Sequence, residues 1–499
     1  MTRSVWLAGI ICFLFISCAE KKEVPPNIIL IYADDLGFGD IGVNGAKGVN
    51  TPNIDRLAKE GVNFTDAHSS AATCTPSRYS LLTGSYAFRN NAAVLSGDAP
   101  LIIDTDMETL PSMLQKAGYR TGVVGKWHLG LGNGEVDWSK RISPGPKEIG
   151  FDYSFLIPAT GDRVPCIFVE DQQVVGLDPD DPIEVSYDNE IGGYPLGSEH
   201  PELLKVHPSS GHDQAIINGI SRIGYMKGGE MALWKDEDFP FILTDKAKKF
   251  IGQQRDAPFF LYWAFHDIHV PRVPHERFVG QSTMGPRGDA IAQMDWCVGQ
   301  IIEYVEELGL SENTLIIFTS DNGPVLDDGY VDQAKELLGD HQPAGPFSGG
   351  KYSMLEAGTR MPTITHWPGT IEPGISSALL SQVDLLASIA KLVNVKVDPT
   401  MAPDSEDHLD AWLGKTNKGR EYMLEEGFSF ALRMGDWKYI EPMSGKPKSW
   451  LKNKGVRTGL INEPQLYHLA EDTSEIKNLS LQYPDKLETM RKKLKVLMK

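Results

Sequence analysis

The sequence predicts an α/β protein with a mostly parallel sheet covered by helices on both faces, followed by a small C-terminal α+β domain with an antiparallel sheet. Three observations predict this. Apolar runs of strand length alternate with amphipathic stretches of helical length, which is the pattern of strand–helix–strand units. Several runs are apolar throughout, as in strands buried on both faces. From about residue 400 the chain changes to short runs separated by turns.

The first elements carry clear boundary signals. A strand is expected over residues 27–35 (NIILIYADD), which is apolar until its two final carboxylates. A helix is expected over 51–61, with Thr51 as its N-cap, Pro52 at the first helical position and Gly61 as its stop. The same alternation predicts helices at 109–117, near 244–253 and at 288–308, and strands at 120–130, 258–269 and 313–323.

The alternation is interrupted and then replaced along the chain. Residues 140–240 are rich in Gly, Pro and Asp, and we expect them to form long substrate-shaping loops over one face of the sheet. After about residue 400, FALRMGDWKYIEP and QLYHLAEDTSEIKNLS resemble antiparallel strands, with a basic helix after them. The predicted organisation is a leader and tether at 1–25, a catalytic α/β domain at 26–400 and a small domain at 401–499.

Charge and length exclude some classes of function. The 499 residues carry a formal net charge of -19, which argues against a nucleic-acid partner because nothing would release counterions from phosphates. An anionic small substrate remains compatible with this charge, since a pocket needs only a few local cations.

The N-terminus has the features of an export signal. Arg3 precedes the short apolar run 5–16, and Cys18 ends a stretch that resembles a bacterial lipoprotein processing site. A cleaved signal without a lipid is the alternative. We therefore expect an exported protein, periplasmic or anchored to the outer membrane of a Gram-negative bacterium by a lipid on Cys18, with the membrane contacted only through that anchor.

Few cysteines remain in the mature chain. They are Cys74, Cys166 and Cys297. Cys297 lies in an amphipathic pattern typical of an inert buried thiol, and Cys166 in an expected strand. A bridge between these two stays open, but there is no disulfide framework. Cys74 therefore needs another explanation.

Two strand ends far apart in the sequence carry acidic and amide side chains. Asp34 and Asp35 end the first strand, and Asp321 and Asn322 end the strand at 313–323. Ligands gather at the carboxyl ends of parallel strands, and oxygen ligands suit a hard cation such as Ca²⁺ or Mg²⁺ better than zinc. Either motif alone could be a turn signal. Together they indicate a metal site.

The stretch that contains Cys74 reads CTPSRYSLLTG (74–84). It matches C-x-P-S-R-x-x-L-x-T-G, and on this motif the chain resembles the type I sulfatases. The alternatives are a structural thiol at a helix start and the thiolate of a cysteine hydrolase. The hydrolase alternative is weak, because no general-base logic explains the Pro and Arg of the motif.

The resemblance covers residues 26–499 and repeats in order. One departure is Thr473, where the family usually has Pro, away from the chemistry. The matching segments are YADDLGFGDIG (32–42), GKWHLG (125–130), HDIHVP (266–271), TSDNG (319–323), GGKYSMLEAGTRMP (349–362) and YHLAEDTSEIKNLS (467–480).

The resemblance implies an alkaline-phosphatase-like fold and a modified nucleophile. A maturation enzyme would oxidise Cys74 to formylglycine, whose hydrated aldehyde offers one hydroxyl to attack sulfur and a second to expel sulfate afterwards. A cation, Ca²⁺ rather than Mg²⁺, would be held by Asp34, Asp35, Asp321, Asn322 and a formylglycine oxygen.

The resemblance also implies roles for five further side chains. Arg78 and His128 would orient the nucleophile, with His128 as the base of the collapse step. Lys126 and Lys351 would grip the sulfuryl oxygens. His269 would protonate the departing alcohol oxygen.

Substrate contacts are less strongly indicated by the sequence. His266 could touch substrate or support His269. In the loop region the candidates are Arg163 beside Asp162, together with His212, Asp213 and Arg222, although the stretch around Arg222 could equally be a helix covering the sheet.

The expected function is removal of O-sulfate from a sulfated oligosaccharide or glycan, with the 6-O-sulfate of a galactose-type sugar as the suggested target. One alternative is a phosphonate or phosphodiester hydrolase of the same superfamily. The other is a surface glycan-binding protein that has lost activity.

Overall fold

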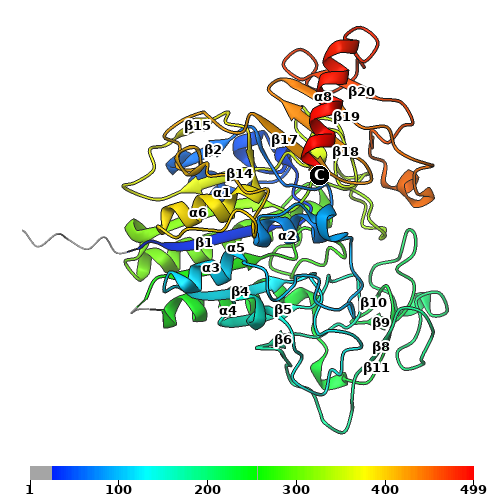
Figure 1. The fold of residues 1–499 in the computed structure, drawn as a ribbon. Helices are drawn as coiled ribbons and strands as arrows, with labels where there is room; N and C mark the ends of the chain where they lie inside the picture. Colours follow the sequence, from blue (N-terminus) through cyan, green and yellow to red (C-terminus); the bar gives the residue numbers. More distant parts are fainter. Residues whose placement is uncertain (1–24, 255–256) are drawn as a thin grey trace, which may run out of the picture.

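The computed structural model describes residues 25–254 and 257–499 (Figure 1). Cys18 and the expected leader lie outside the described residues. Within the described chain, no helix has both the length and the apolar character needed to cross a membrane.

A ten-stranded sheet forms the centre of the molecule. Its order is β15-β2-β14-β13-β1-β12-β4-β5-β6-β7. The middle of the sheet is parallel. Parallel strands need crossover connections, and the connecting helices bury these strands on both faces. These parallel strands are β13 (Thr314–Ser320), β1 (Asn27–Ala33), β12 (Phe259–Ala264), β4 (Arg120–Lys126) and β5 (Tyr153–Ile157).

Both edges of the sheet change direction. On one side β14 (Thr363–His366) runs antiparallel to β13, and β2 (Val62–Phe64) runs antiparallel to β14. β15 (Gly374–Ser376) then pairs parallel with β2. On the other side the short strands β6 (Val169–Glu170) and β7 (Gln173–Val174) continue antiparallel from β5.

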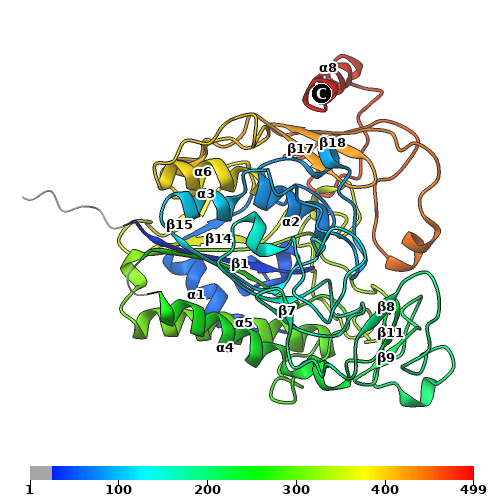
Figure 2. The ribbon, with the colours of Figure 1, turned by 60° about the horizontal axis from the view of Figure 1, so that its bottom comes forward.

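Helices cover both faces of the sheet (Figure 2). One layer holds α1 (Pro52–Glu60), α4 (Phe239–Gln253) and α5 (Gly285–Glu307), and the other holds α2 (Cys74–Thr83), α3 (Leu110–Lys116) and α6 (Leu385–Leu392). α1 begins at the proline that the sequence indicated. This architecture confirms the predicted fold class. The remaining short elements are β3 (Ala67–His68), β16 (Leu380–Ser381) and α7 (Leu409–Trp412).

Residues 140–240 contribute more to the sheet than the sequence indicated. They supply β5, β6 and β7. The rest of the segment forms two small antiparallel pairs that lie on the side toward which β1 runs (Figure 1). Apart from a strand around Cys166, the sequence analysis expected long loops here, so β5, β7 and these pairs were not anticipated. The stretch around Arg222 forms strands, not a helix. These pairs are β8 (Glu184–Ser186) with β11 (Tyr225–Lys227) and β9 (Ile216–Ile217) with β10 (Ile220–Ser221).

A second sheet forms near the C-terminus. Its four antiparallel strands follow the order β17-β18-β19-β20. Helix α8 (Pro484–Leu497) covers one face with Met490 and Leu494, which are buried among apolar side chains of the sheet. The strands are β17 (Tyr422–Glu426), β18 (Phe430–Met434), β19 (Trp437–Ile440) and β20 (Gln465–His468).

A buried network of charges joins the two sheets. Glu356 lies 2.9 Å from Arg433 and 3.1 Å from Lys438, both of the second sheet. Its backbone N–H also donates to Glu475 over 2.7 Å. Burial raises the pKa of Glu475 to about 8, in spite of Lys438 nearby. The junction is therefore held by charges that water does not screen.

Candidate active site

Side chains that lie at or after the carboxyl ends of four central strands meet at one end of the sheet. Asp34 and Asp35 follow β1, Lys126 ends β4, and His269 lies in the loop after β12. Asp321 and Asn322 follow β13, and Cys74 is the first residue of α2. The structure thus brings together the residues that the sequence placed at strand ends.

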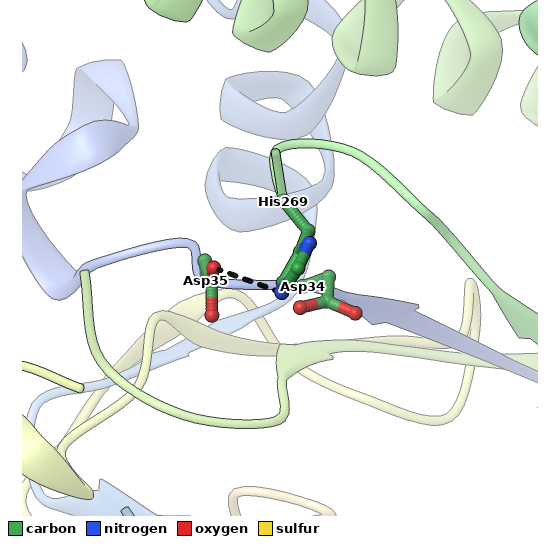
Figure 3. Close-up of side chains that lie close together, drawn as sticks. All are labelled: Asp34, Asp35 and His269. Atoms are coloured by element: carbon green, nitrogen blue, oxygen red, sulfur yellow. Dashed lines mark ion pairs between the residues drawn. The ribbon is translucent and has the colours of Figure 1, made fainter. Parts of the chain in front are cut away.

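Asp34, Asp35 and His269 form the centre of this cluster (Figure 3). One ligand atom from each lies within 4.8 Å of the others. The Asn322 amide donates to Asp35 Oδ1 over 2.7 Å, and Asp321 Oδ1 accepts from the backbone N–H of Asp35 at 3.3 Å. The four residues predicted as metal ligands are therefore neighbours.

The donor set fits a hard divalent cation. Among the described residues, Asp34 Oδ1 and Asn322 Oδ1 are buried oxygens without a hydrogen-bond partner. Burial, with the nearby Asp321, raises the pKa of Asp34 to about 7, and burial also raises the pKa of Asp35. A divalent cation with oxygen ligands would bind these unpartnered oxygens and would balance the negative charge of the buried carboxylates.

Arg78 supports the acidic cluster from beneath. Its buried guanidinium lies 2.7 Å from Asp321 Oδ2 and 2.9 Å from Asp34 Oδ2. The same group donates to the Lys126 carbonyl over 3.2 Å. The resemblance had implied that Arg78 orients the nucleophile, whereas its donors are directed to the carboxylates. Arg78 therefore positions Asp34 and Asp321, two of the residues predicted as metal ligands.

Each of the two lysines forms an ion pair with one of the adjacent carboxylates. Lys126 forms a fully buried ion pair with Asp34. Lys351 lies 3.0 Å from Asp35 and 2.7 Å from Asp328 Oδ2. Each ammonium group is thus fixed at the edge of the acidic cluster, where a charged substrate group would arrive.

Asp328 was missed by the sequence analysis. Besides Lys351, it contacts Lys454 at 2.5 Å and accepts from the Tyr352 hydroxyl at 3.1 Å. Although burial opposes ionisation, these two lysines lower the pKa of Asp328 to about 2. Its sequence context, VLDDGY, reads as an ordinary turn, so no local signal marks it.

Cys74 faces His128. Sγ lies 3.3 Å from His128 Nδ1, and His128 Nε2 lies 2.9 Å from the carbonyl oxygen of Leu95. Because a carbonyl only accepts, Nε2 carries the proton and Nδ1 presents a lone pair to Cys74. Burial, followed by Lys126, lowers the pKa of His128, while burial raises that of Cys74. A neutral thiol beside a neutral imidazole is unlike the thiolate of a cysteine hydrolase.

His269 presents one nitrogen to the same space. Its Nδ1 donates to the Val270 carbonyl over 2.7 Å, so Nε2 is left facing Asp35 and Asp328, each 3.9 Å away. His266 is placed differently. It is buried behind His269, with ring centroids 5.9 Å apart, and burial lowers its pKa to about 3.

A cleft opens above these residues. One cavity of about 460 Å³ includes Cys74, His269 and Lys351, and an adjoining cavity of about 360 Å³ includes Asp162 and His212. The two cavities share wall residues and are therefore adjacent, and we refer to them together as the cleft. The shared residues are Arg163, Tyr352 and Trp450.

The expected substrate contacts separate into two groups. Arg163 lines both cavities and pairs with Asp162 at 2.8 Å. His212 lies 3.0 Å from the same carboxylate, and Asp213 lines the second cavity. Arg222, in contrast, is fully buried against Asp236 at 2.7 Å and lines neither cavity, and His266 lines neither as well. For Arg222 the prediction was wrong, because its guanidinium has structural partners.

The structure also settles the open cysteine pairing. Cys166 and Cys297 are both buried free thiols.

The wall that the C-terminal region supplies was not anticipated. Phe428, Lys448 and Trp450 line the first cavity. Trp450 and Tyr352 pack edge to face with centroids 5.0 Å apart, and Phe428 lies 5.9 Å from Trp450. No motif marks these residues.

Comparison with known proteins places these observations in context. Residues 26–395 match the family model described as Sulfatase. N-acetylgalactosamine-6-O-sulfatase of Bacteroides thetaiotaomicron is 52% identical over 470 residues, covering 93% of this chain and 91% of the relative. Human arylsulfatase A is 33% identical over 430 residues, covering 83% of this chain and 74% of that protein. A solved structure from work on the metabolism of multiple glycosaminoglycans by Bacteroides thetaiotaomicron superposes with a TM-score of 0.93 at 51% identity, covering 95% of this chain and 99% of that one.

Proposed function

The chain belongs to the sulfatase family and is a sulfuric ester hydrolase acting on saccharides; from this premise we propose that it removes the 6-O-sulfate of an N-acetylgalactosamine unit. The observation that carries this proposal is the 52% identity, over nearly the full length, to a relative that bears this activity in its name. The cleft supports it, because polar groups able to hydrogen-bond sugar hydroxyls stand beside the buried cluster.

Arg163 is the proposed sugar contact, and Asp162 holds it at 2.8 Å at the cleft wall. His212 supports this contact, because its Nε2 lies 3.0 Å from Asp162 and its Nδ1 lies 3.0 Å from the Ser210 carbonyl, so both ring nitrogens have partners within the protein. A site built to bond a particular hydroxyl rejects a sugar that lacks it, because buried polar groups are then left unpaired. Arg163 would then select the configuration of the sugar.

We propose that Cys74 is converted to formylglycine by a maturation enzyme that reads the CTPSR motif. When hydrated, this group would supply one hydroxyl that attacks sulfur and a second hydroxyl whose deprotonation re-forms the aldehyde and breaks the C–O bond to the sulfate. His128 Nδ1, 3.3 Å from the Cys74 position, would take the proton in the second stage. The Leu95 carbonyl keeps the other imidazole nitrogen protonated, so the lone pair remains directed at this position.

The cation is proposed to be Ca²⁺, held by Asp34, Asp35, Asp321 and Asn322, with the modified residue 74 as a further oxygen ligand. When bound, it would supply charge neutralisation for the sulfate and a fixed position for the nucleophilic oxygen. Arg78 keeps two of the carboxylates in place. Lys126 and Lys351 would stabilise charge on the sulfuryl oxygens.

His269 is proposed to protonate the departing sugar oxygen. Its Nε2 faces the cleft because Nδ1 is engaged by the Val270 carbonyl. Burial, followed by Lys351 and Lys126, holds the pKa of His269 well below its ordinary value, so the negative charge of a bound ester is needed to favour the protonated imidazole. A sugar alkoxide is a poor leaving group, so this proton is needed for turnover.

We also propose that the protein is exported and anchored in the cell envelope through a lipid on Cys18, in a Gram-negative bacterium. The support is the sequence pattern of residues 1–18 alone. Labelling with a fatty-acid analogue in the native cell, comparing the wild-type chain with Cys18→Ser, tests this. Label on both chains, or on neither, contradicts it.

Sulfate release from a matched set of sugars tests the proposed substrate. Using protein from its native cell, we expect hydrolysis of N-acetylgalactosamine 6-sulfate and at most slow hydrolysis of the glucosamine epimer. Faster hydrolysis of the epimer would overturn the proposal. A paired phosphate ester distinguishes the phosphohydrolase alternative, and binding without sulfate release would indicate the inactive glycan-binding protein.

Mass spectrometry tests the nucleophile directly. A tryptic peptide containing residue 74 should be about 18 Da lighter than its thiol form if cysteine has become formylglycine. An unmodified thiol in active protein would overturn the assignment.

A further inference from the structure

One segment of the cleft wall has a charge opposite to that of the protein. Residues 444–457 (SGKPKSWLKNKGVR) contain Lys446, Lys448, Lys452, Lys454 and Arg457 and no acidic residue, in a chain of net charge -19. This segment connects β19 to β20 and reaches the cleft, where Lys448 lines the first cavity and Lys454 the second.

Most of this charge is not used within the protein. Lys454 is buried and pairs with Asp328. Arg457 donates to the backbone carbonyls of residues 474 and 475. Within 25–254 and 257–499, no carboxylate forms an ion pair with Lys446, Lys448 or Lys452, which are exposed. Three like charges held within seven residues repel one another unless an anion lies between them.

The position of the segment relative to the buried site defines what could bind there. The Cys74 cavity includes both Lys448 and Trp450, so a sugar whose sulfate reaches residue 74 has its other end beside this loop. Trp450 is 37% exposed and stands with Tyr352 and Phe428 as an aromatic wall. Such a wall packs against the apolar face of a sugar ring, and the ammonium groups lie beyond it.

The acidic groups of the same cleft do not cancel this charge. Glu426 also lines the first cavity, but burial raises the pKa of its carboxylate to about 7, and that carboxylate accepts the backbone N–H of Phe88 at 3.0 Å. Asp162 and Asp328 are each paired with a cation. Asp213, on the wall of the second cavity, is the acidic group left facing solvent among the described lining residues.

We propose that Lys446, Lys448 and Lys452 form a subsite for an anionic group on the sugar next to the one that loses its sulfate. The inference rests on the proposed function and names its substrate more closely: a polyanionic oligosaccharide rather than an isolated sugar. The bound group is a carboxylate or a sulfate, since either supplies the same charge. The lysines act on the bound chain, and the buried cluster acts on the ester.

Three substrates that share the same sulfated N-acetylgalactosamine test the subsite. One links it to glucuronate, one to the carboxyl-reduced sugar, and one to a neutral sugar that carries a sulfate. At low ionic strength we expect kcat/KM to be about tenfold higher for either anionic neighbour than for the reduced one, as weak exposed ion pairs acting together would give. High salt should remove the difference. A preference for only one anionic neighbour identifies the carboxylate or the sulfate as the ligand.

The variant Lys446→Gln/Lys448→Gln/Lys452→Gln should lose this preference. The matched control is Lys396→Gln/Lys415→Gln/Lys418→Gln, which removes the same charge from exposed lysines that line neither cavity, and it should keep the preference. A wild-type enzyme indifferent to the neighbour, or a triple variant that keeps the tenfold preference, overturns the subsite. Either result leaves the proposed function standing if all three substrates are cleaved.

Binding measured without chemistry separates the two proposals. Calorimetry with an unsulfated chondroitin tetrasaccharide, which carries carboxylates only, should give salt-dependent binding to wild type and to the control and at least fivefold weaker binding to the triple variant. Equal affinities of the three proteins for this tetrasaccharide overturn a carboxylate subsite even if no substrate is cleaved, and equal affinities for a tetrasaccharide whose neighbouring sugar carries a sulfate overturn the subsite altogether.

Discussion

The cleft is built from two regions that differ in burial and in origin. The catalytic floor consists of Asp34, Arg78, Lys126 and Asp321, all fully buried and held to one another by ion pairs at strand ends. The rim consists of Arg163, His212, Lys448 and Trp450, which come from irregular segments on either side. The comparison teaches that the reaction is fixed by the sheet, whereas the choice of substrate is left to loops that the sheet does not constrain.

The largest effect is expected from a substitution that removes the reacting atom from the floor. Cys74→Ala should lower kcat/KM by about 10⁴-fold or more on every sulfate ester, because no hydroxyl nucleophile can then form. Sulfate release and the melting temperature are the measurements. Substantial residual turnover in a folded variant would show that residue 74 is not the nucleophile.

A substitution of Asp328 tests whether the floor and the rim have separate roles in catalysis and in substrate binding. Asp328→Asn should lower kcat about 100-fold on saccharide and aryl sulfates alike, because Lys351 loses its charged partner and its position. Asp327→Asn is the control, since Asp327 pairs with the exposed Lys335 and lies outside the cleft lining. An effect on KM alone, with kcat kept, would assign Asp328 to the rim.

His212 tests the rim. His212→Ala should lower kcat/KM on the sulfated sugar about 30-fold, because Asp162 loses a partner and no longer holds Arg163 in place for a sugar hydroxyl. Nitrophenyl sulfate, which has no such hydroxyl, should be hydrolysed at nearly the wild-type rate. His200→Ala, on an exposed loop residue, serves as control. Equal losses on both substrates would mean that His212 supports the floor.

The smallest effect concerns the charged junction that holds the rim-bearing second sheet to the first. Burial raises the pKa of Glu475 to about 8 in the folded protein, above that of an exposed glutamate near 4.5. The folded state therefore binds more protons between these values, and stability falls as the pH rises through this window.

Glu475→Gln removes this titration while keeping an acceptor for the Glu356 N–H. We expect the wild-type melting temperature to fall relative to the variant by about 2–4 °C between pH 5 and pH 8.5. Calorimetric scans at several pH values measure this. Parallel curves for the two proteins would contradict the assignment.

The carboxylates of the floor were predictable from the sequence for a physical reason, whereas Arg78 and Lys126 were expected only from the family resemblance. Strands buried on both faces have to be apolar, so the carboxylates at their ends are conspicuous, and parallel strands bring these ends together. How deeply each side chain is buried, and which partners it has, was harder to predict from the sequence. Arg222 was assigned to the substrate because sequence shows no partners, and Arg78 to the nucleophile because of the family resemblance, while the structure pairs both with buried carboxylates.

Most residues of the rim could not be predicted from the sequence. β5 was missed because polar turns surround it, and Asp328 became visible only through contacts with Lys351 and Lys454, which are distant along the chain. Trp450 and Lys448 belong to a connection without a motif. Such residues are brought together by tertiary contacts that local patterning does not encode.

The attachment of that connection has a consequence for how such enzymes diversify. β19 and β20 are adjacent antiparallel strands, so residues 441–464 leave the second sheet and return to its neighbouring position. Closing a flexible loop of twice the length costs only about 0.6 kcal/mol more. Insertions and deletions between these strands are therefore nearly neutral for folding, and descendants of one ancestor could acquire preferences for different glycans here while inheriting the same chemistry.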